Sequence, residues 1–185
     1  NNLIKELQKK IETGIVIKLD ISENQAKSIY LGIGSNLGSR KANIEKAKSL
    51  LIEDKIDLIS TSSYYETPSW PNPKNPKFLN IVVKIISSLK PFQLLNLCKT
   101  IETKLGRKKS EKNSPRECDI DIVDFNALIL RDQLNLPHKL MHKRNFVLFP
   151  LFEIEKEWVH PITRVNIKKL ILSLSDSDIR SIKQI

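Results

Sequence analysis

The chain is poor in the residues and segments that mark several protein classes. Its 185 residues include only two cysteines, Cys98 and Cys118, which is too few for a disulfide framework or a cysteine–histidine metal cluster. This shortage favours a reducing cytoplasm over secretion. No apolar run approaches the roughly 18 residues of a membrane-spanning helix. The opening residues NNLIKELQKKIE also lack the apolar stretch of a signal peptide, so no membrane partner is expected.

Positive charge, in contrast, is abundant. Lys and Arg outnumber Asp and Glu by 31 to 21, which gives a formal net charge of +10. Such a balance favours an anionic partner, whether nucleic acid, anionic lipid or a phosphorylated small molecule. A hydrophobic content of 40% with 28% charged residues is typical of a folded domain rather than of a disordered chain.

Residues 29–125 alternate regularly between patterns typical of strands and of helices. Apolar spacing and β-branched content predict strands at 29–34, 57–67, 78–89 and 118–125, and helices at 39–54 and 92–106. Four prolines make 68–77 an irregular loop. The order β-α-β-β-α-β predicts an α+β fold of the ferredoxin-like type, an antiparallel sheet with helices packed on it. A C-terminal extension follows, with a last helix near 166–174.

Residues 1–28 do not belong to this pattern. The segment LIKELQKKIE is amphipathic, and IVIKLDI at 15–21 alternates as a strand does. We therefore predict an N-terminal extension at 1–28 and one domain at 29–185. Because the chain does not begin with Met, we expect the extension to be the end of a preceding fused domain or an appended αβ element.

Two aspartates lie in the last predicted strand of the domain, CDIDIVDF. Asp119 and Asp121 are two positions apart, so they point to the same side of the strand, about 6.5 Å from each other. At that distance two like charges repel by about 2–3 kcal/mol in an effective dielectric of 20. Either they are solvated on an edge strand, or a cation compensates them. Mg²⁺ binds one or two carboxylates together with substrate phosphates, and two such ions can bridge a nucleotide's phosphates.

Basic residues gather in two segments of the chain. The loop RKKSEKNSPRE at 107–117 leads directly into the strand, and its arginines have the fork geometry that matches phosphate oxygens. Most loops of this composition are merely solvated, but this position favours the docking of a phosphate. The segment LNLPHKLMHKRNF at 134–146 adds His138 and Arg144, which suit phosphate contact, although two histidines do not make a zinc site.

The segment LGIGSNLGSR places three glycines between the first strand and the first helix. It matches neither G-x-G-x-x-G nor the Walker pattern. A structural turn and a loop beside a ligand both remain open for it.

Seven stretches together resemble the 6-hydroxymethyl-7,8-dihydropterin pyrophosphokinase family of folate biosynthesis. They are IGSNLG, SSYYETP, FLNIVV, IETKLGR, PRECDIDI, LPH and KRNFVLFPLFEI, in the family's order across about 29–172. The resemblance implies an enzyme that transfers the β,γ-diphosphate of ATP to the hydroxymethyl group of the pterin and releases AMP. It also implies two Mg²⁺ ions as cofactors.

The resemblance further implies roles for single residues. The expected catalytic residues are two metal-binding aspartates and two arginines of a loop that closes over the phosphates: Asp119, Asp121, Arg107 and Arg116. Beside Arg107, the expected ATP contacts are Glu102, Lys109, His138 and Arg144. The pterin ring is expected between two aromatic rings, with an amide and main-chain groups at its polar edge: Phe78, Phe146, Asn80, Thr67, Pro68 and Trp70.

Two departures from the family pattern and two alternative functions remain. Asn113 and Ser114 stand where the family usually has Trp-Gly, and Phe78 replaces a commoner Tyr. The net charge and the ferredoxin-like order also suit a nucleic-acid-binding module, but that function calls for exposed aromatics on the sheet and leaves the aspartates unexplained. A noncatalytic pterin or nucleotide binder is the other alternative. We expect small-molecule partners, covalent fusion to other folate enzymes and no nucleic acid.

Overall fold

The computed structural model describes residues 17–18, 28–108 and 113–185 of the chain. The segment 3–12, predicted to be amphipathic, lies outside the described residues. The described elements are, in chain order, β1 (Ile17–Lys18), β2 (Ile29–Ser35), α3 (Arg40–Glu53), β3 (Asp57–Thr61), β4 (Tyr65–Thr67), β5 (Phe78–Ile86), α4 (Pro91–Lys104), β6 (Asp119–Phe125), β7 (Leu128–Arg131), β8 (Asn135–Leu136), the 3-10 turn η1 (Met141–Lys143), α5 (Asn145–Ile154), α6 (Ile167–Leu172), α7 (Asp176–Ser181) and β9 (Lys183–Gln184).

The main sheet is antiparallel and confirms the ferredoxin-like α+β prediction. Its strand order is β6-β2-β5-β4-β9, and β3 also pairs with β5. The register sets Gly34 of β2 between Asn80 of β5 and Asp119 of β6, and it pairs Gly32 with Asp121. Adjacent strands therefore bring the aspartates and the predicted pterin contacts to one part of the sheet.

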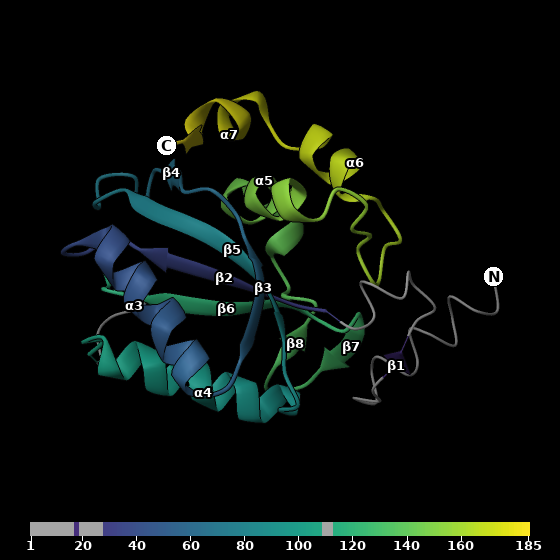
Figure 1. Cartoon of the computed structure of the whole chain (residues 1–185). Coiled ribbons are helices and arrows are strands. Elements are labelled where there is room, and N and C mark those ends of the chain that lie inside the picture. The colour runs from purple at the N-terminus through teal and green to yellow at the C-terminus, as the bar shows by residue number, and fades with distance from the viewer. Residues whose placement is uncertain (1–16, 19–27, 109–112) are drawn as a thin grey trace.

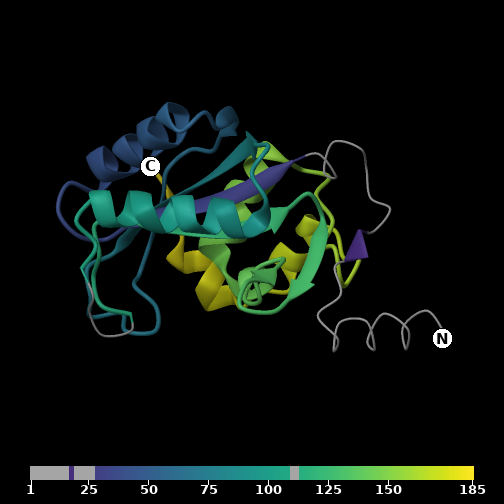
Figure 2. The same ribbon diagram turned by 90° about the horizontal axis from the view of Figure 1, so that it is seen from below.

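Helices cover both faces of the sheet (Figure 1). Helices α3 and α4 lie side by side on one face, as the view from below shows, and the C-terminal helices lie on the other (Figure 2). Alternation along β2 explains the two layers: Leu31 and Ile33 enter the core under α3 and α4, whereas Tyr30 enters the core under α5 and α6. Each buried apolar side chain of this size contributes about 1.5–3 kcal/mol to folding.

Two strand predictions need correction, and a third falls largely outside the described residues. The segment 57–67 is two strands, because residues 62–64 leave the ladder and Ser63 N–H turns to the Glu153 carboxylate. The strand predicted at 78–89 ends at Ile86, where Ser87 Oγ accepts from Leu89 N–H in a local turn. Of the strand predicted at 15–21, the structure describes only Ile17–Lys18, paired with β7 in a small sheet of order β1-β7-β8.

The C-terminal extension supplies the second helical layer and the last strand. Helix α5 packs on β5, α6 packs on α5, and β9 pairs antiparallel with β4. The helix predicted near 166–174 is confirmed as α6, whereas α7 and β9 have no counterpart in the predicted elements. Within the described ranges, no helix is both long and apolar enough to cross a membrane.

Candidate active site

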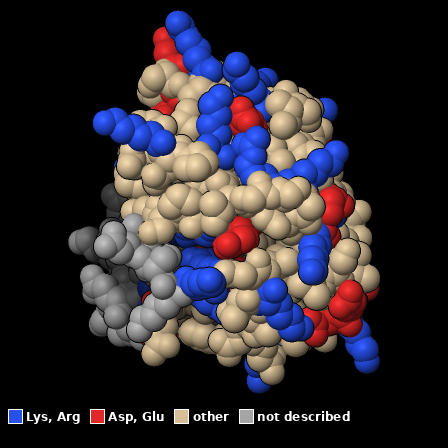
Figure 3. All heavy atoms as spheres, turned by 90° about the vertical axis from the view of Figure 1, so that its left-hand side faces the viewer, with Lys and Arg blue, Asp and Glu red and all other residues tan. Residues whose placement is uncertain are grey.

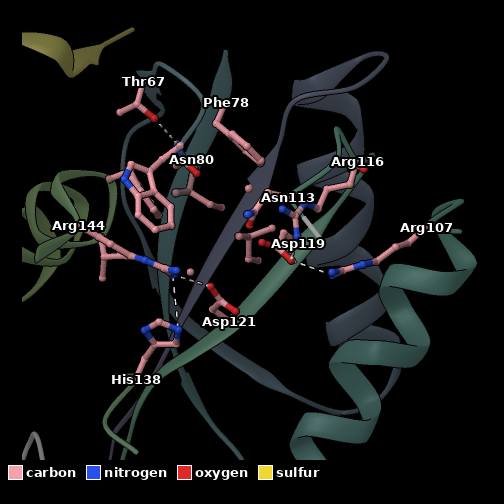
Figure 4. A pocket seen from close by; sticks show the side chains of 18 of the residues that line it. Thr67, Phe78, Asn80, Arg107, Asn113, Arg116, Asp119, Asp121, His138 and Arg144 are labelled. Carbon is pink, nitrogen blue, oxygen red and sulfur yellow. Dashed lines mark hydrogen bonds and ion pairs between the residues drawn. The ribbon is translucent and has the colours of Figure 1, made fainter. Parts of the chain in front are cut away.

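A cavity of about 500 Å³ opens where β2, β5 and β6 meet the loop 68–77, the residues after α4 and the start of α5. This volume lies in the range of small-molecule sites, about 300–1,000 Å³. Figure 4 shows charged side chains at one end of the cavity, and Phe78, Asn80 and Thr67 at the other. The two ends therefore differ in chemistry.

The two aspartates lie at the charged end. Along β6, Ile120 and Ile122 enter the core, so Asp119 and Asp121 face the cavity together, as strand alternation predicts. Guanidinium groups compensate both of them. Asp119 Oδ1 accepts from Arg107 Nη1 at 2.8 Å and from Arg116 Nη1 at 3.2 Å. Asp121 Oδ2 accepts from Arg144 Nη1 at 3.1 Å (Figure 4).

Glu102 lies beneath this cluster and is not one of the residues that line the cavity. Its side chain is 2% exposed and forms an ion pair with Arg107 at 2.6 Å. Its Oε1 also accepts from the Ile120 N–H at 2.8 Å, which joins α4 to β6. Burial raises the pKa of Glu102. Burial alone would lower the pKa of Arg107, but the negative charges of Asp119 and Glu102 outweigh it, so the pKa of Arg107 is raised. Glu102 therefore positions Arg107, and its predicted contact with ATP stays a prediction.

Arg116 offers a donor that nothing satisfies within the described part of the chain. Its Nε is buried and has no hydrogen-bond partner there, while its Nη1 contacts Asp119. Its guanidinium also lies 5.9 Å from the centroid of the Phe78 ring. Since buried donors are normally paired, an anionic ligand in the cavity is the natural partner of this N–H.

His138 and Arg144 form the opposite rim of the charged end. Arg144 lies 5.4 Å from the centroid of the Phe146 ring and 3.5 Å from His138 Nε2. Burial lowers the pKa of His138 despite the opposing effect of Asp121, which favours the neutral ring. Its Nδ1 accepts from the Leu140 N–H at 3.2 Å, which favours the tautomer with the proton on Nε2, the nitrogen that Arg144 Nη1 also faces. His138 therefore presents an N–H beside Arg144 without adding a charge.

The other end of the cavity is aromatic with a few buried polar groups. Phe78 and Phe146 both line it, from β5 and α5. Asn80 is 6% exposed and Thr67 is 2% exposed, and Asn80 Nδ2 donates to Thr67 Oγ1 at 3.2 Å. Trp70, in contrast, is 63% exposed in the loop 68–77. Aromatic faces with a fixed amide suit a flat heterocycle that forms hydrogen bonds at its edge.

Gly34 allows the backbone of β2 to pass close to this end. A Cβ at Gly34 would lie 2.8 Å from Asn80 Oδ1 and 3.3 Å from the Phe78 ring, whereas a Cβ at Gly32 would meet nothing nearer than 3.6 Å. We expect Gly34→Ala to displace Asn80 and Phe78 and to raise the KM of the ligand bound there about tenfold or more. Gly32→Ala is the matched control, with less than a threefold effect. Equal effects of the two substitutions in steady-state kinetics would contradict this.

Most predicted site residues come together in the cavity. Apart from Glu102, every described one lines it, namely Arg107, Arg116, Asp119, Asp121, His138, Arg144, Thr67, Pro68, Trp70, Phe78, Asn80 and Phe146. Lys109 lies outside the described residues. The lining also includes nine residues that were not among the predicted site residues: Gly32, Ile33, Gly34, Ile81, Lys99, Lys108, Asn113, Ser114 and Val147. Lys99 is one helical turn before Glu102 and 3.8 Å from it, a spacing that could have revealed it.

The carboxylate pair suits a metal ion that arrives with its substrate. Hard oxygen donors match Mg²⁺, which usually takes one or two carboxylates and completes its shell with phosphates and water. Within the described part of the chain, no group of three or more His, Cys, Asp or Glu side chains could hold an ion by itself. Asp119 and Asp121 therefore fit substrate-bound Mg²⁺ rather than an all-protein metal site.

The fold and the cavity together define a class of protein. An α+β domain that sets paired carboxylates and arginines beside an aromatic pocket is typical of enzymes that transfer phosphate-containing groups by positioning and charge neutralisation. The model of one such family, 7,8-dihydro-6-hydroxymethylpterin-pyrophosphokinase (HPPK), matches residues 30–156.

Similar proteins carry related names. The chain is 40% identical over 143 residues to the 2-amino-4-hydroxy-6-hydroxymethyldihydropteridine pyrophosphokinase of Aquifex aeolicus, a match that covers 77% of this chain and 89% of the relative. It is 38% identical over 147 residues to the folic acid synthesis protein FOL1 of Dictyostelium discoideum, covering 79% of this chain and 22% of the relative. A crystal structure of a Plasmodium falciparum HPPK-DHPS variant has the same fold, with a TM-score of 0.64 and 16% identity, over 85% of this chain and 47% of that one.

The chain belongs to the HPPK family. It is a pyrophosphokinase of folate synthesis that transfers the pyrophosphoryl group of ATP to hydroxymethyldihydropterin. The family assignment selects the enzyme over the nucleic-acid-binding module and the noncatalytic binder. In addition, Lys and Arg are spread over the face in Figure 3 with Asp and Glu among them, rather than gathered into one stripe.

Proposed function

We propose that the charged end of the cavity holds Mg²⁺-bound ATP and that the aromatic end holds the pterin, with Arg107, Arg116, Asp119 and Asp121 as the catalytic residues. One observation carries this assignment: two carboxylates and three guanidinium groups share a cavity with two aromatic rings and a buried amide. A phosphate chain and a flat heterocycle each find a matching end, and the reacting groups meet between them.

Asp119 and Asp121 would hold two Mg²⁺ ions together with the phosphates of ATP. When bound, these ions neutralise phosphate charge and polarise the phosphoryl group that is attacked. Arg107, Arg116 and Arg144, which contact the aspartates in the structure, then have phosphate oxygens as alternative acceptors. His138 donates from Nε2, and Lys108 and Lys109 add positive charge. The Nε of Arg116, which has no hydrogen-bond partner among the described residues, supports this exchange of partners.

The pterin is proposed to stack between Phe78 and Phe146. Asn80 and Thr67 read the polar edge of the ring, with the main chain around Pro68 and Trp70. This pose directs the hydroxymethyl oxygen towards the β-phosphorus of ATP. A bond forms between that oxygen and the β-phosphorus, the bond from this phosphorus to the oxygen that bridges it to the α-phosphorus breaks, and AMP leaves with the bridging oxygen. The hydroxyl proton passes to solvent water.

The first prediction is that the protein releases AMP from ATP only when hydroxymethyldihydropterin is present. Chelation with EDTA should abolish the release, and added Mg²⁺ should restore it, because the two carboxylates need metal to hold the phosphates. The measurement is AMP formation by chromatography, with and without each component. AMP release in the presence of excess EDTA would rule out the metal assignment and leave the reaction itself intact.

The second prediction concerns stacking. Phe146→Ala should weaken pterin binding about tenfold or more and ATP binding less than threefold, because a stacked aromatic face contributes roughly 1–3 kcal/mol. Calorimetric titration with the pterin and with a non-hydrolysable ATP analogue measures both affinities. Phe92→Ala is the control, since Phe92 is 39% exposed on α4 and does not line the cavity. Equal losses of both ligands would contradict the stacking role.

We also propose a cytoplasmic location and fusion to other folate enzymes. Cys98 and Cys118 are buried free thiols, which supports a reducing compartment. Fusion is supported by relatives such as the Dictyostelium protein, of which this chain spans about a fifth. The family model matches residues 30–156, and its start supports the proposed boundary between an extension at 1–28 and a domain at 29–185.

A further inference from the structure

Asn36 lies directly behind the wall of the cavity. It follows β2, it is 2% exposed, and it is not one of the residues that line the cavity. A buried amide carries both donors and an acceptor that need partners. Those partners show what the residue does.

The partners of Asn36 belong to two different loops. Its backbone N–H donates to the Arg116 carbonyl at 3.1 Å, and its Oδ1 accepts from the Arg116 N–H at 2.8 Å. Asn36 therefore binds both main-chain polar groups of Arg116. Its Nδ2 donates to the Pro76 carbonyl at 3.1 Å. One side chain thus joins the end of the loop before β6 to the end of the loop before β5.

Each partner leads to a different end of the cavity. Arg116 contacts Asp119 at 3.2 Å at the charged end. Pro76 precedes Phe78 by two residues, and Phe78 forms part of the aromatic end. The Arg116 guanidinium lies 5.9 Å from the centroid of the Phe78 ring, so the two ends meet at this pair. Any shift between the two loops would change that separation.

We infer that Asn36 is a positioning residue for the transfer reaction. It fixes the main chain at Arg116 relative to the start of β5, and so holds the phosphate-contacting guanidinium against the ring on which the pterin stacks. The inference depends on the proposed function for the identity of the two ligands. An amide serves both loops, because it offers an acceptor to the Arg116 N–H and a donor to the Pro76 carbonyl.

Two variants separate the two contacts of the side chain. Asn36→Ala removes both, whereas Asn36→Asp keeps an acceptor for the Arg116 N–H and loses the donor to Pro76. We expect Asn36→Ala to lower kcat/KM for the pterin about thirtyfold, because small misplacements of reacting groups cost up to about a hundredfold. Asn36→Asp should fall between Asn36→Ala and the unmodified protein.

Asn43→Ala is the matched control. Asn43 also holds the segment after β2, with Nδ2 donating to the Leu37 carbonyl at 2.9 Å and to Ser35 Oγ at 3.3 Å. It is not one of the residues that line the cavity. Its loss should change kcat/KM less than threefold, since it leaves the contacts to Arg116 and Pro76 in place.

A double-mutant cycle distinguishes positioning from general stabilisation. If Asn36 acts through Arg116, Asn36→Ala should cost less than threefold when added to Arg116→Ala, although it costs about thirtyfold alone. The same cycle with Asn36→Asp carries the test if Asn36→Ala does not fold. Independent, multiplicative losses, an active Asn36→Ala enzyme with unchanged kinetics, or loss of folding in both variants would each overturn the inference. An unmodified protein without pterin-dependent AMP release would instead defeat the proposed function.

Discussion

Asp121→Asn is expected to lower kcat about a thousandfold or more while the protein remains folded. Asn keeps the shape of the side chain but removes the charge that would hold a metal ion, and enzymes of this class depend on such charge neutralisation. The Asp121 side chain is 40% exposed and its ion pair is with Arg144. Because pairs at such exposure contribute only about 0–1 kcal/mol, stability should change little. Steady-state AMP release and thermal denaturation measure the two effects.

Asp119→Ala should show a loss of similar size. Asp119 contacts both Arg107 and Arg116, so its removal also frees two guanidinium groups to repel each other. Asp132→Asn is the control, since Asp132 is an exposed acid that does not line the cavity. A loss of less than tenfold in either aspartate variant, at saturating ATP and Mg²⁺, would contradict the metal assignment.

The paired aspartates were predictable from the sequence because a strand has a strict period of two. The pattern CDIDIVDF buries Ile120 and Ile122 and leaves Asp119 and Asp121 on the cavity side. The residues that neutralise the charges of the two aspartates were only partly predictable. The sequence indicated Arg107 and Arg116 by their nearness, but it gave no reason for Arg144, 23 residues further on, to reach Asp121.

Residues that act from behind the cavity are the ones that the sequence did not reveal. Asn36 lies in a glycine-rich loop that fits a plain turn equally well, and its partners at Pro76 and Arg116 are 40 and 80 residues away. Glu102 was predicted as an ATP contact, which stays a prediction, but its burial at 2% exposure beneath Arg107 was not apparent from the sequence. A sequence pattern indicates which residues lie near a site. How deeply the Glu102 side chain is buried, however, depends on how helix α4 packs on the sheet.

The boundaries of strands were also only partly predictable. Residues 57–67 have continuous strand propensity, but the ladder breaks at 62–64, where Ser63 binds Glu153 from α5. This interruption is caused by a tertiary contact, which the β-propensity of the segment does not predict. The sequence did predict the order of the elements, because turn residues and hydrophobic periodicity separate them clearly between 29 and 125.

Arg116→Ala is expected to lower kcat by about a hundredfold to a thousandfold, the second largest effect. The guanidinium combines three properties that the reaction needs: a contact with Asp119, a place near the Phe78 ring and a buried Nε without a partner in the described structure. Arginines that neutralise phosphate charge in transfer reactions contribute about 10³–10⁵ to kcat. The lower value is expected here because Arg107 and Arg144 share the task.

The comparison of Arg116→Lys with Arg116→Ala tests the geometry of this contribution. Lys keeps the charge but has neither the planar fork nor an Nε–H, so it should restore less than a tenth of the lost kcat. Arg180→Ala is the control, since Arg180 is 83% exposed on α7. Full recovery with Lys would show that charge alone matters and that the unpaired Nε has no part in holding the phosphates. Recovery of KM for ATP without recovery of kcat would instead show that the charge suffices for ground-state binding and that the fork acts in the transition state, because a uniform binding contact changes KM alone.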